Sequence, residues 1–416
     1  MHWPRGIVTI VMVLAASSVT RSADWPQFRG PERTGKSAET GLLQQWPAGG
    51  PKMLWSMGGL GVGWSSVSVV EGTIYTLGML NKQGILFAFD VQGKGKWQRS
   101  YGREWTGSHP GVRSTPTVEG DRIYVISGNC GVNCFEKQTG TIVWQLDAYE
   151  RFKVKKKPRW GFAESPLVVG DKVICTPGGS EGTMAALHKN NGRVIWACKE
   201  INETSSFCTP TLCEWGGRKL IVTQTSESIL GVDAETGKLL WRVPFATYQP
   251  PPAKGINPPA PYYHHGCVYV TSGYDDKGVM LELSADGSSA KVKWVDATLD
   301  NHHGHVVQID GFIYGANWLS NSNGNWVCLD WETGKVQWEK HWFNKGSIIY
   351  ADGMLYCYEE KSGNLGLVKP SPQGFHLVSS FQITQGDGRH WAHPVISNGV
   401  LYVRHGDVLM AFAIKG

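Results

Sequence analysis

The chain has 416 residues, among them 52 Gly and 19 Trp, and only 18% of the residues are charged. This composition indicates short strands joined by tight turns and argues against a helical protein. The net charge of 40 − 35 = +5 is too small to indicate a nucleic-acid partner. Nine cysteines are compatible with an oxidising compartment, and an odd number leaves at least one unpaired.

The first 23 residues are typical of an export signal. Arg5 precedes an apolar stretch from Ile7 to Ala16, and small residues follow up to Ala23. Because this stretch is too short to span a bilayer, we expect cleavage near residue 23 and a secreted or periplasmic domain over residues 24–416. The alternative is an uncleaved membrane anchor. No later segment has eighteen uninterrupted apolar residues, so no transmembrane segment is predicted.

A repeated pattern begins near residue 66 and continues to the end of the chain. A Pro or β-branched residue opens each unit, and an aromatic or β-branched residue follows eight positions later, beyond a turn. In the fourth unit the interval is longer, because Trp215-Gly216-Gly217 adds residues to the turn. Self-similarity at a period of about 45 residues indicates a propeller or a solenoid. The opening residues are Val67, Pro116, Pro166, Pro210, Pro261, Val306, Ile348 and Pro394.

A second motif closes most units with a Trp four residues after a turn Gly, as in Gly237 and Trp241. The Gly supplies the positive φ of a tight turn, and we expect the Trp to fill the space between neighbouring blades. The residues expected to dock the blades are Trp55, Trp97, Trp144, Trp196, Trp241, Trp294 and Trp338.

The two ends of the mature chain complement one another. The eighth unit stops at Gly416 without a closing Trp strand, while Pro51 to Trp55 has the form of such a strand. The predicted fold is therefore all-β: an eight-bladed β-propeller of four-stranded antiparallel blades, with the last blade closed by an N-terminal strand. Closure removes exposed sheet edges, so a monomer is expected.

These residues resemble a known family. The unit with Asp233 to Lys238 (DAETGK) and its closing Trp resembles the pyrroloquinoline-quinone-like (PQQ-like) β-propeller repeat, and Asp24 to Pro31 (DWPQFRGP) is similar to the start of many secreted bacterial proteins with this repeat. The resemblance covers essentially the whole mature chain. It implies the propeller fold, and for function it implies either a quinoprotein dehydrogenase, which binds PQQ and calcium, or a cofactor-free assembly scaffold.

The chain departs from both well-understood branches. The dehydrogenases cover the quinone with a disulfide between adjacent cysteines, and this chain has no adjacent cysteines. Their calcium ligands, a Glu, an Asn and a catalytic Asp, have no match here. The scaffold lipoprotein carries a lipid-modified Cys, which is also missing. PQQ with calcium is therefore not supported by motif, and the cofactor stays undetermined.

The rigid spacing allows residues that lead into the innermost strands to be aligned, and these should meet at one mouth of the central channel. Alternation along a strand puts the positions one and three residues before each opening residue on one face. Glu164 is the one acid in these segments, with its side chain expected on the opposite face. The candidate ligand-binding residues are Trp64, Arg113, Glu164, His303, His305, Lys345, Trp391 and His393.

Three interpretations of the mouth remain open. In the first, the side chains only hydrogen-bond strand ends and ordered water. In the second, Arg113 and Lys345 together with the two Trp bind a small anionic or aromatic ligand. In the third, His303, His305 and His393 hold a metal ion. The leading functional hypothesis is a non-catalytic scaffold that binds a small ligand or a protein partner. The rival is a PQQ-dependent oxidoreductase acting on an alcohol or a sugar. No catalytic residue is predicted.

Overall fold

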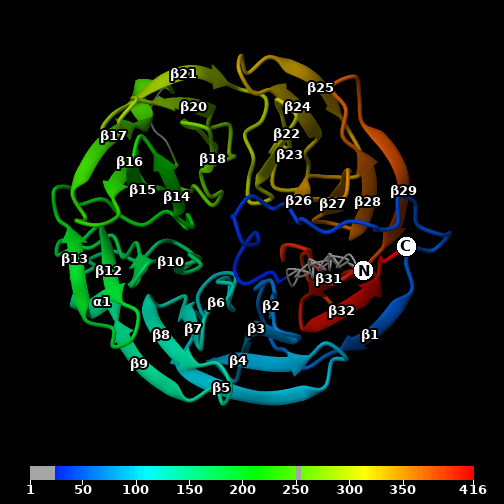
Figure 1. Ribbon diagram of the computed structural model, residues 1–416, viewed down its shortest axis with the longest axis horizontal. Helices are drawn as coiled ribbons and strands as arrows, with labels where there is room; N and C mark the ends of the chain where they lie inside the picture. The colour runs from blue at the N-terminus through cyan, green and yellow to red at the C-terminus, as the bar shows by residue number, and fades with distance from the viewer. Residues whose placement is uncertain (1–23, 250–253) are drawn as a thin grey trace, which may run out of the picture.

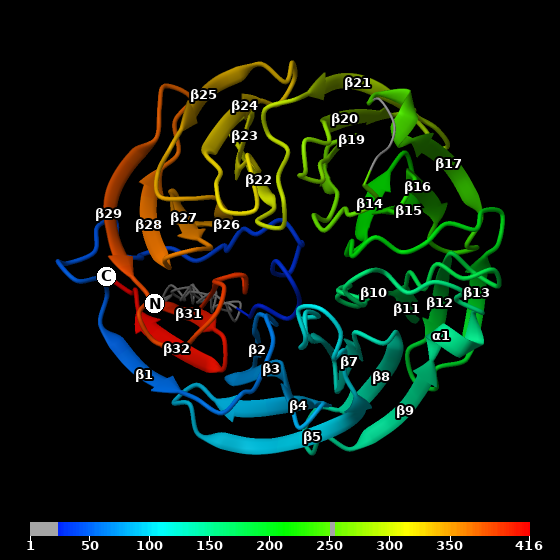
Figure 2. The same cartoon turned by 180° about the vertical axis from the view of Figure 1, so that it is seen from behind.

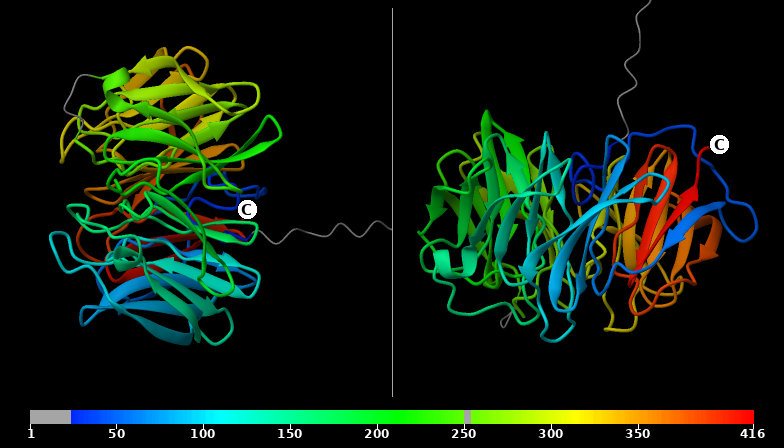
Figure 3. Two further views of the ribbon diagram at one scale, coloured as in Figure 1. Left: turned by 90° about the vertical axis from the view of Figure 1, so that its left-hand side faces the viewer. Right: turned by 90° about the horizontal axis from the view of Figure 1, so that it is seen from below.

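The computed structural model describes residues 24–249 and 254–416, so the expected signal peptide lies outside the described residues. Eight four-stranded antiparallel sheets stand around a central axis (Figure 1), and the view from behind shows the same closed ring (Figure 2). Side views show the twisted sheets set as blades around that axis (Figure 3). The predicted eight-bladed propeller is confirmed.

The first four blades follow one another along the chain. Blade 1 consists of β2 (Ser68–Val70), β3 (Thr73–Leu80), β4 (Gln83–Asp90) and β5 (Gly95–Arg103), and blade 2 of β6 (Thr117–Glu119), β7 (Arg122–Ile126), β8 (Gly131–Glu136) and β9 (Ile142–Asp147). Blade 3 consists of β10 (Leu167–Val169), β11 (Lys172–Cys175), β12 (Met184–His188) and β13 (Val194–Cys198), and blade 4 of β14 (Thr211–Trp215), β15 (Arg218–Gln224), β16 (Ser228–Asp233) and β17 (Leu239–Pro244).

The remaining blades complete the ring. Blade 5 consists of β18 (Tyr262–His264), β19 (Cys267–Val270), β20 (Gly278–Leu283) and β21 (Ala290–Asp296), and blade 6 of β22 (Val306–Ile309), β23 (Phe312–Ala316), β24 (Trp326–Asp330) and β25 (Val336–Lys340). Blade 7 consists of β26 (Gly346–Ala351), β27 (Met354–Glu359), β28 (Asn364–Lys369) and β29 (His376–Gln382), and blade 8 of β30 (Val395–Ser397), β31 (Val400–His405), β32 (Val408–Ala413) and β1 (Met53–Met57).

Within residues 24–249 and 254–416, helix is confined to two short pieces, α1 (Ala148–Arg151) and the 3-10 turn Phe245–Thr247. None of the helices in the described ranges has the length and apolar character that a bilayer crossing requires.

The N-terminal strand closes the ring as predicted. β1 pairs with β32, with Trp55 opposite Ala411, so the two ends of the described chain share blade 8. In Figure 1 the blue strand β1 lies beside the red strand β32. A ring closed in this way leaves no open sheet at the junction of first and last blades.

The eight-residue repeat corresponds to one constant hairpin register. In blade 2 Thr117, which follows the opening Pro116, pairs with Tyr124, and in blade 8 Val395 pairs with Tyr402 in the same way. In blade 4 Thr211 pairs with Val222, because Gly216 and Gly217 lengthen the connection. The hydrophobic pattern and the tight turn set this register together.

The outer-strand Trp side chains lie between blades. Nε1 of Trp144 donates to the Lys189 carbonyl of blade 3 at 2.8 Å, and Nε1 of Trp196 donates to the Ala234 carbonyl of blade 4 at 3.1 Å. Trp55 of blade 8 donates to Val91 of blade 1 at 2.8 Å. Each indole thereby adds a directional bond to the apolar contact it makes with the next blade.

Blade 4 departs from this arrangement. Nε1 of Trp241 is buried without a hydrogen-bond partner, and Trp215 at the end of β14 donates instead to the Ser284 carbonyl of blade 5, at 3.0 Å. The longer hairpin that interrupts the sequence repeat therefore supplies a replacement contact.

The central channel is occupied by the segment from Asp24 to Lys36, which we call the N-terminal plug. Trp25 pairs with Val69 of blade 1, and Val118 of blade 2 donates its N–H to the Pro26 carbonyl at 2.8 Å. Figure 1 shows this blue segment looping at the centre of the ring before it leaves over blade 7. The DWPQFRGP motif thus has a structural role that its sequence did not reveal.

Two buried arginines hold the plug. Arg29 donates to the carbonyls of Val306 in blade 6 and Ile348 in blade 7, while Arg33 donates to those of Pro166 and Pro210, which lead into blades 3 and 4. Burial lowers the pKa of Arg29 to about 10 and that of Arg33 to about 9, so both stay charged at neutral pH. One short segment therefore joins distant blades at the axis.

The contact between turn Gly and neighbouring Trp is testable with a matched pair. A Cβ at Gly237 (φ +75°) would lie 2.5 Å from a ring carbon of Trp196, whereas one at Gly311 (φ +85°) would meet nothing within 4 Å. Gly311→Ala should cost about 1–2 kcal/mol for the left-handed backbone alone. Gly237→Ala should cost a further ~1–3 kcal/mol of overpacking, measured by urea unfolding. Equal losses would show that the Trp contact contributes nothing.

Candidate functional site

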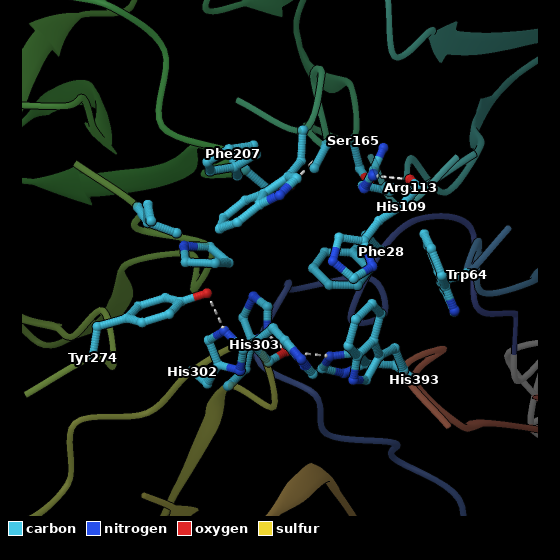
Figure 4. Close-up of a pocket in the computed structure, with 17 residues that line it drawn as sticks. Phe28, Trp64, His109, Arg113, Ser165, Phe207, Tyr274, His302, His303 and His393 are labelled. Carbon is cyan, nitrogen blue, oxygen red and sulfur yellow. Dashed lines mark hydrogen bonds between the residues drawn. The ribbon is translucent and has the colours of Figure 1, made fainter. Parts of the chain in front are cut away.

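A cavity of about 180 Å³ lies at the mouth of the channel, with the plug as its floor (Figure 4). Phe28 of the plug enters it, 5.1 Å between ring centroids from both His305 and His393. The walls come mainly from loops that lead into the innermost strands. The lining residues are Phe28, Trp64, His109, Arg113, Trp160, Ala163, Ser165, Phe207, Thr209, Ile256, Pro258, Tyr274, His302, His303, His305, Trp391 and His393.

Most of the aligned positions converge on this cavity. Of the residues three before each unit's opening residue, all line it except Lys345. Of those one before, Ser165, Thr209, His305 and His393 line it. The hydroxyl-bearing members also tie blades together, because the Thr115 N–H donates to Oγ of Ser165 at 2.9 Å and the Ser165 N–H donates to Oγ1 of Thr209 at 3.0 Å.

Aromatic rings form an almost continuous wall. The rings of Trp64 and Trp391 are 4.9 Å apart, those of Trp391 and His303 are 5.1 Å apart, and those of Trp160 and Phe207 are 5.6 Å apart. Figure 4 shows Phe207, Tyr274, His303 and Phe28 directed at the same space. Such a wall presents π-faces to any ring that enters.

Four lining residues other than glycine have a left-handed backbone. Their φ values are +53° at His109, +76° at Phe207, +63° at Tyr274 and +60° at His305. For bulky side chains each such residue costs of the order of 1–3 kcal/mol, which the surrounding structure must offset. Strained residues that cluster around one cavity are typical of a functional site, because backbone strain without a functional role is not expected to persist.

Arg113 is the charged residue of the lining. Its guanidinium lies 5.4 Å from the Trp64 ring centre and donates to the carbonyls of His109 and Gly111. Burial lowers its pKa to about 10, partly opposed by Glu104. Two of its five N–H groups are used in these two bonds, so donors remain for an anionic ligand.

Lys345 and Glu164 lie away from the cavity. Nζ of Lys345 forms an ion pair with Oε1 of Glu360 at 2.9 Å and donates to the Ser320 carbonyl at 2.7 Å. Glu164 accepts the Thr176 N–H at 2.8 Å inside blade 3, and burial raises its pKa to about 8. Neither side chain is placed to bind a ligand at the mouth.

Four of the cavity histidines are neutral at physiological pH. Burial lowers the pKa of His303 and of His393 to about 3, and it lowers the pKa values of His302 and His305 well below the usual range. The imidazoles of His305 and His393 both hydrogen-bond the His303 carbonyl, at 3.0 and 2.9 Å. In the predicted metal set of His303, His305 and His393, one ring nitrogen of His305 and one of His393 are therefore engaged with backbone, whereas Nε2 of His303 has no hydrogen-bond partner.

Several lining residues were not found from the sequence. Phe28 belongs to the plug, Tyr274 to the β19–β20 connection, and His109 and Trp160 to long connections between blades. The alignment of innermost strands contains none of these positions. His302 lay next to the aligned His303, and the dense His segment at 302–305 was the available signal for it.

The fold and the cavity define the chain as a closed eight-bladed β-propeller with an aromatic pocket at its channel mouth. It belongs to the PQQ-like propeller family described as outer membrane protein assembly factor BamB, which matches residues 82–340. This confirms the resemblance to PQQ-like repeats.

The proteins that this chain resembles include both BamB proteins and a quinohemoprotein alcohol dehydrogenase. BamB of Shewanella oneidensis is 25% identical over 264 residues, 60% of this chain and 62% of that protein, so the match leaves more than a third of the relative uncovered. Quinohemoprotein alcohol dehydrogenase from Comamonas testosteroni superposes with a TM-score of 0.67 at 14% identity, covering 96% of this chain and 82% of that one. BamB from Moraxella catarrhalis gives 0.61 at 15% identity, covering 88% and 98%. At such identities the structural likeness shows the fold alone.

The raised pKa of Glu164 predicts a pH-dependent stability. Since the folded state holds this proton up to about pH 8 while the unfolded chain releases it near 4.5, wild type should lose stability relative to Glu164→Gln as pH rises between these values. The difference should grow by at most about 1.4 kcal/mol per pH unit. Urea unfolding of both proteins at several pH values measures it, and parallel profiles would contradict the buried acid.

Proposed function

We propose that this chain is an exported, non-catalytic binding propeller that captures a small aromatic ligand, with at most one negative charge, in the cavity at its channel mouth. The observation that carries the proposal is the set of four left-handed, bulky residues that hold their rings around one cavity. Export follows from the expected signal peptide, and the BamB family supports a scaffold without a reaction of its own.

The size of the cavity favours one ring. At about 180 Å³ it is comparable to an engineered cavity of about 150 Å³ that holds benzene, and it is below the 300–1,000 Å³ of ordinary drug-sized pockets. Its floor is closed by Phe28 and the plug, so a longer molecule cannot pass down the channel.

The charge of the cavity favours a monoanion. Arg113 lines it, while the charge of Lys345 is compensated by Glu360 outside the lining. No carboxylate occurs among the described residues that form the wall. A ring with one carboxylate would place its face against the Trp side chains and its oxygens toward Arg113.

The histidines of this wall are poorly suited to general acid or base catalysis. A catalytic group should have a pKa near the working pH, but those of His303 and His393 are about 3. This supports binding rather than turnover.

PQQ with calcium does not fit the cavity. The quinone has three fused rings and three carboxylates, against room for about one ring and the one lining cation Arg113. Calcium takes oxygen ligands, mostly carboxylates, which the described wall does not offer. All nine cysteines lie within the described residues and each is buried and free, so no disulfide covers the site.

Binding of benzoate tests the proposal. We expect quenching or enhancement of Trp fluorescence to report saturable 1:1 binding, and Arg113→Met to weaken it about 10- to 100-fold, because a charge-assisted hydrogen bond contributes ~1.5–3 kcal/mol. Benzyl alcohol, the neutral analogue, should bind both proteins alike. Equal benzoate affinity in both proteins would contradict the assigned role of Arg113.

The same titration with PQQ and Ca²⁺ separates the rival function. Our assignment predicts no saturable uptake at micromolar PQQ and no dye reduction with an alcohol panel. Stoichiometric uptake with turnover would establish the oxidoreductase instead.

A protein partner at the same face is a second candidate. Leu319 is 48% and Phe343 is 53% exposed, on two loops joined by a 2.8 Å bond from Asn344 to the Ser322 carbonyl. Exposed large apolar side chains beside a pocket are typical of interaction surfaces. A photo-crosslinker at position 343 should form a defined adduct in the exported compartment, and one at Ile195 on an outer strand should not. Equal adducts at both positions would rule out this face.

A further inference from the structure

Three potential metal ligands meet beside the cavity, in a place that differs from the set expected from the sequence. One ring nitrogen of His302, one ring nitrogen of His303 and one carboxylate oxygen of Glu360 all lie within 4.8 Å of one another. The histidines precede β22 in blade 6, while Glu360 follows β27 in blade 7. The cluster therefore bridges two blades at the mouth.

Each of the three side chains carries a buried atom that lacks a hydrogen-bond partner, namely Nδ1 of His302, Nε2 of His303 and Oε2 of Glu360. Nε2 of His303 and Oε2 of Glu360 are 3.2 Å apart, yet their orientation forms no hydrogen bond. The Glu360 side chain is only 4% exposed. An unsatisfied buried polar atom costs about 1–3 kcal/mol, so three that face one another call for a common partner.

The other atoms of this cluster are already held in place. Nε2 of His302 shares a 2.7 Å hydrogen bond with the Tyr274 hydroxyl, and Oε1 of Glu360 forms an ion pair with Nζ of Lys345 at 2.9 Å. Metal ligands are commonly oriented by such bonds on their far atoms. If Nε2 of His302 donates to Tyr274, the unpartnered Nδ1 carries the lone pair that an ion needs.

We propose that His302, His303 and Glu360 bind one divalent first-row transition-metal ion, with an open coordination position toward the aromatic cavity. Two imidazole nitrogens and a carboxylate oxygen form a ligand set of the kind that holds Zn²⁺ or Fe²⁺ with room for a further ligand. The opening faces the cavity because both histidines line it.

The distances suit such an ion. Ligands about 2.1 Å from a tetrahedral metal are about 3.4 Å apart, close to the 3.2 Å between His303 and Glu360. Closing the remaining separations, at most 4.8 Å, needs side-chain shifts of the order of 1 Å. These shifts are available to His302, which is neither fully buried nor part of a strand.

The positive charge of the Lys345 ammonium weakens the binding of a cation at this site. It lies on the far oxygen of Glu360, and its other bonds are to the carbonyls of Ser320 and Asn323. The ion pair leaves the carboxylate with little net charge, so we expect micromolar rather than tighter binding.

Calorimetric titration of tag-free, chelator-treated protein with Zn²⁺ tests the site. We expect one ion per chain in wild type and an affinity at least tenfold weaker in His303→Gln and in His302→Gln. Co²⁺ should give the visible absorption of a four- or five-coordinate site in wild type, and this absorption should be lost in both variants.

His393→Gln is the matched control, since His393 belongs to the same cavity but its Nε2 is engaged with the His303 carbonyl. Its affinity for Zn²⁺ should stay within about threefold of wild type. A double variant of the surface pair His264 and His265 should likewise bind normally. No uptake by wild type, unchanged affinity in both His302 and His303 variants, or loss of binding in the His393 control would each overturn the proposal. Zinc uptake is measured without benzoate, so it succeeds or fails independently of the proposed small-ligand binding.

Discussion

The constraint on which the rest of this structure depends is the inner edge of each blade. The innermost strand of a blade has a partner on one side only, so its remaining backbone groups face a channel and must be satisfied there. In this chain the plug arginines and hydroxyl side chains such as Ser165 and Thr209 supply hydrogen-bond partners for these backbone groups. Arg29 serves carbonyls of two blades and Arg33 serves those of two others across the axis.

The plug also makes the cavity. By closing the channel beneath the mouth it turns a through-going pore into a pocket with a floor, and Phe28 supplies that floor with an aromatic face. The buried guanidinium of Arg29 opposes protonation of nearby histidines, so it adds to the effect of burial on the pKa of His305 and of His393. The floor of the cavity and part of the effect that keeps its His305 and His393 neutral therefore both come from the plug.

Much of the fold was predictable because its determinants are local and repeated. An eight-residue hairpin register and a Trp four residues after a turn Gly recur from blade to blade, and each copy supports the same interpretation. The plug was not predictable, since DWPQFRGP occurs once and its partners are backbone carbonyls, which leave no trace in the sequence. Trp215 illustrates the same limit: it appeared as an interruption of the repeat, yet it makes the contact that Trp241 lacks.

The candidate site was predictable only where strand alternation holds. Alternation placed His303 and His305 on one face, but the left-handed backbone at His305 turns that residue away from the regular course, and its Nδ1 bonds to the His303 carbonyl. Glu360 comes from a hairpin of the neighbouring blade, and its partner Lys345 was expected to face the mouth. Residues from two blades can be recognised as one cluster only when the positions of both blades are known, because the spacing between these residues in the sequence follows no repeat. The residues that alternation missed are thus those whose positions depend on the packing of whole blades rather than on the course of one strand.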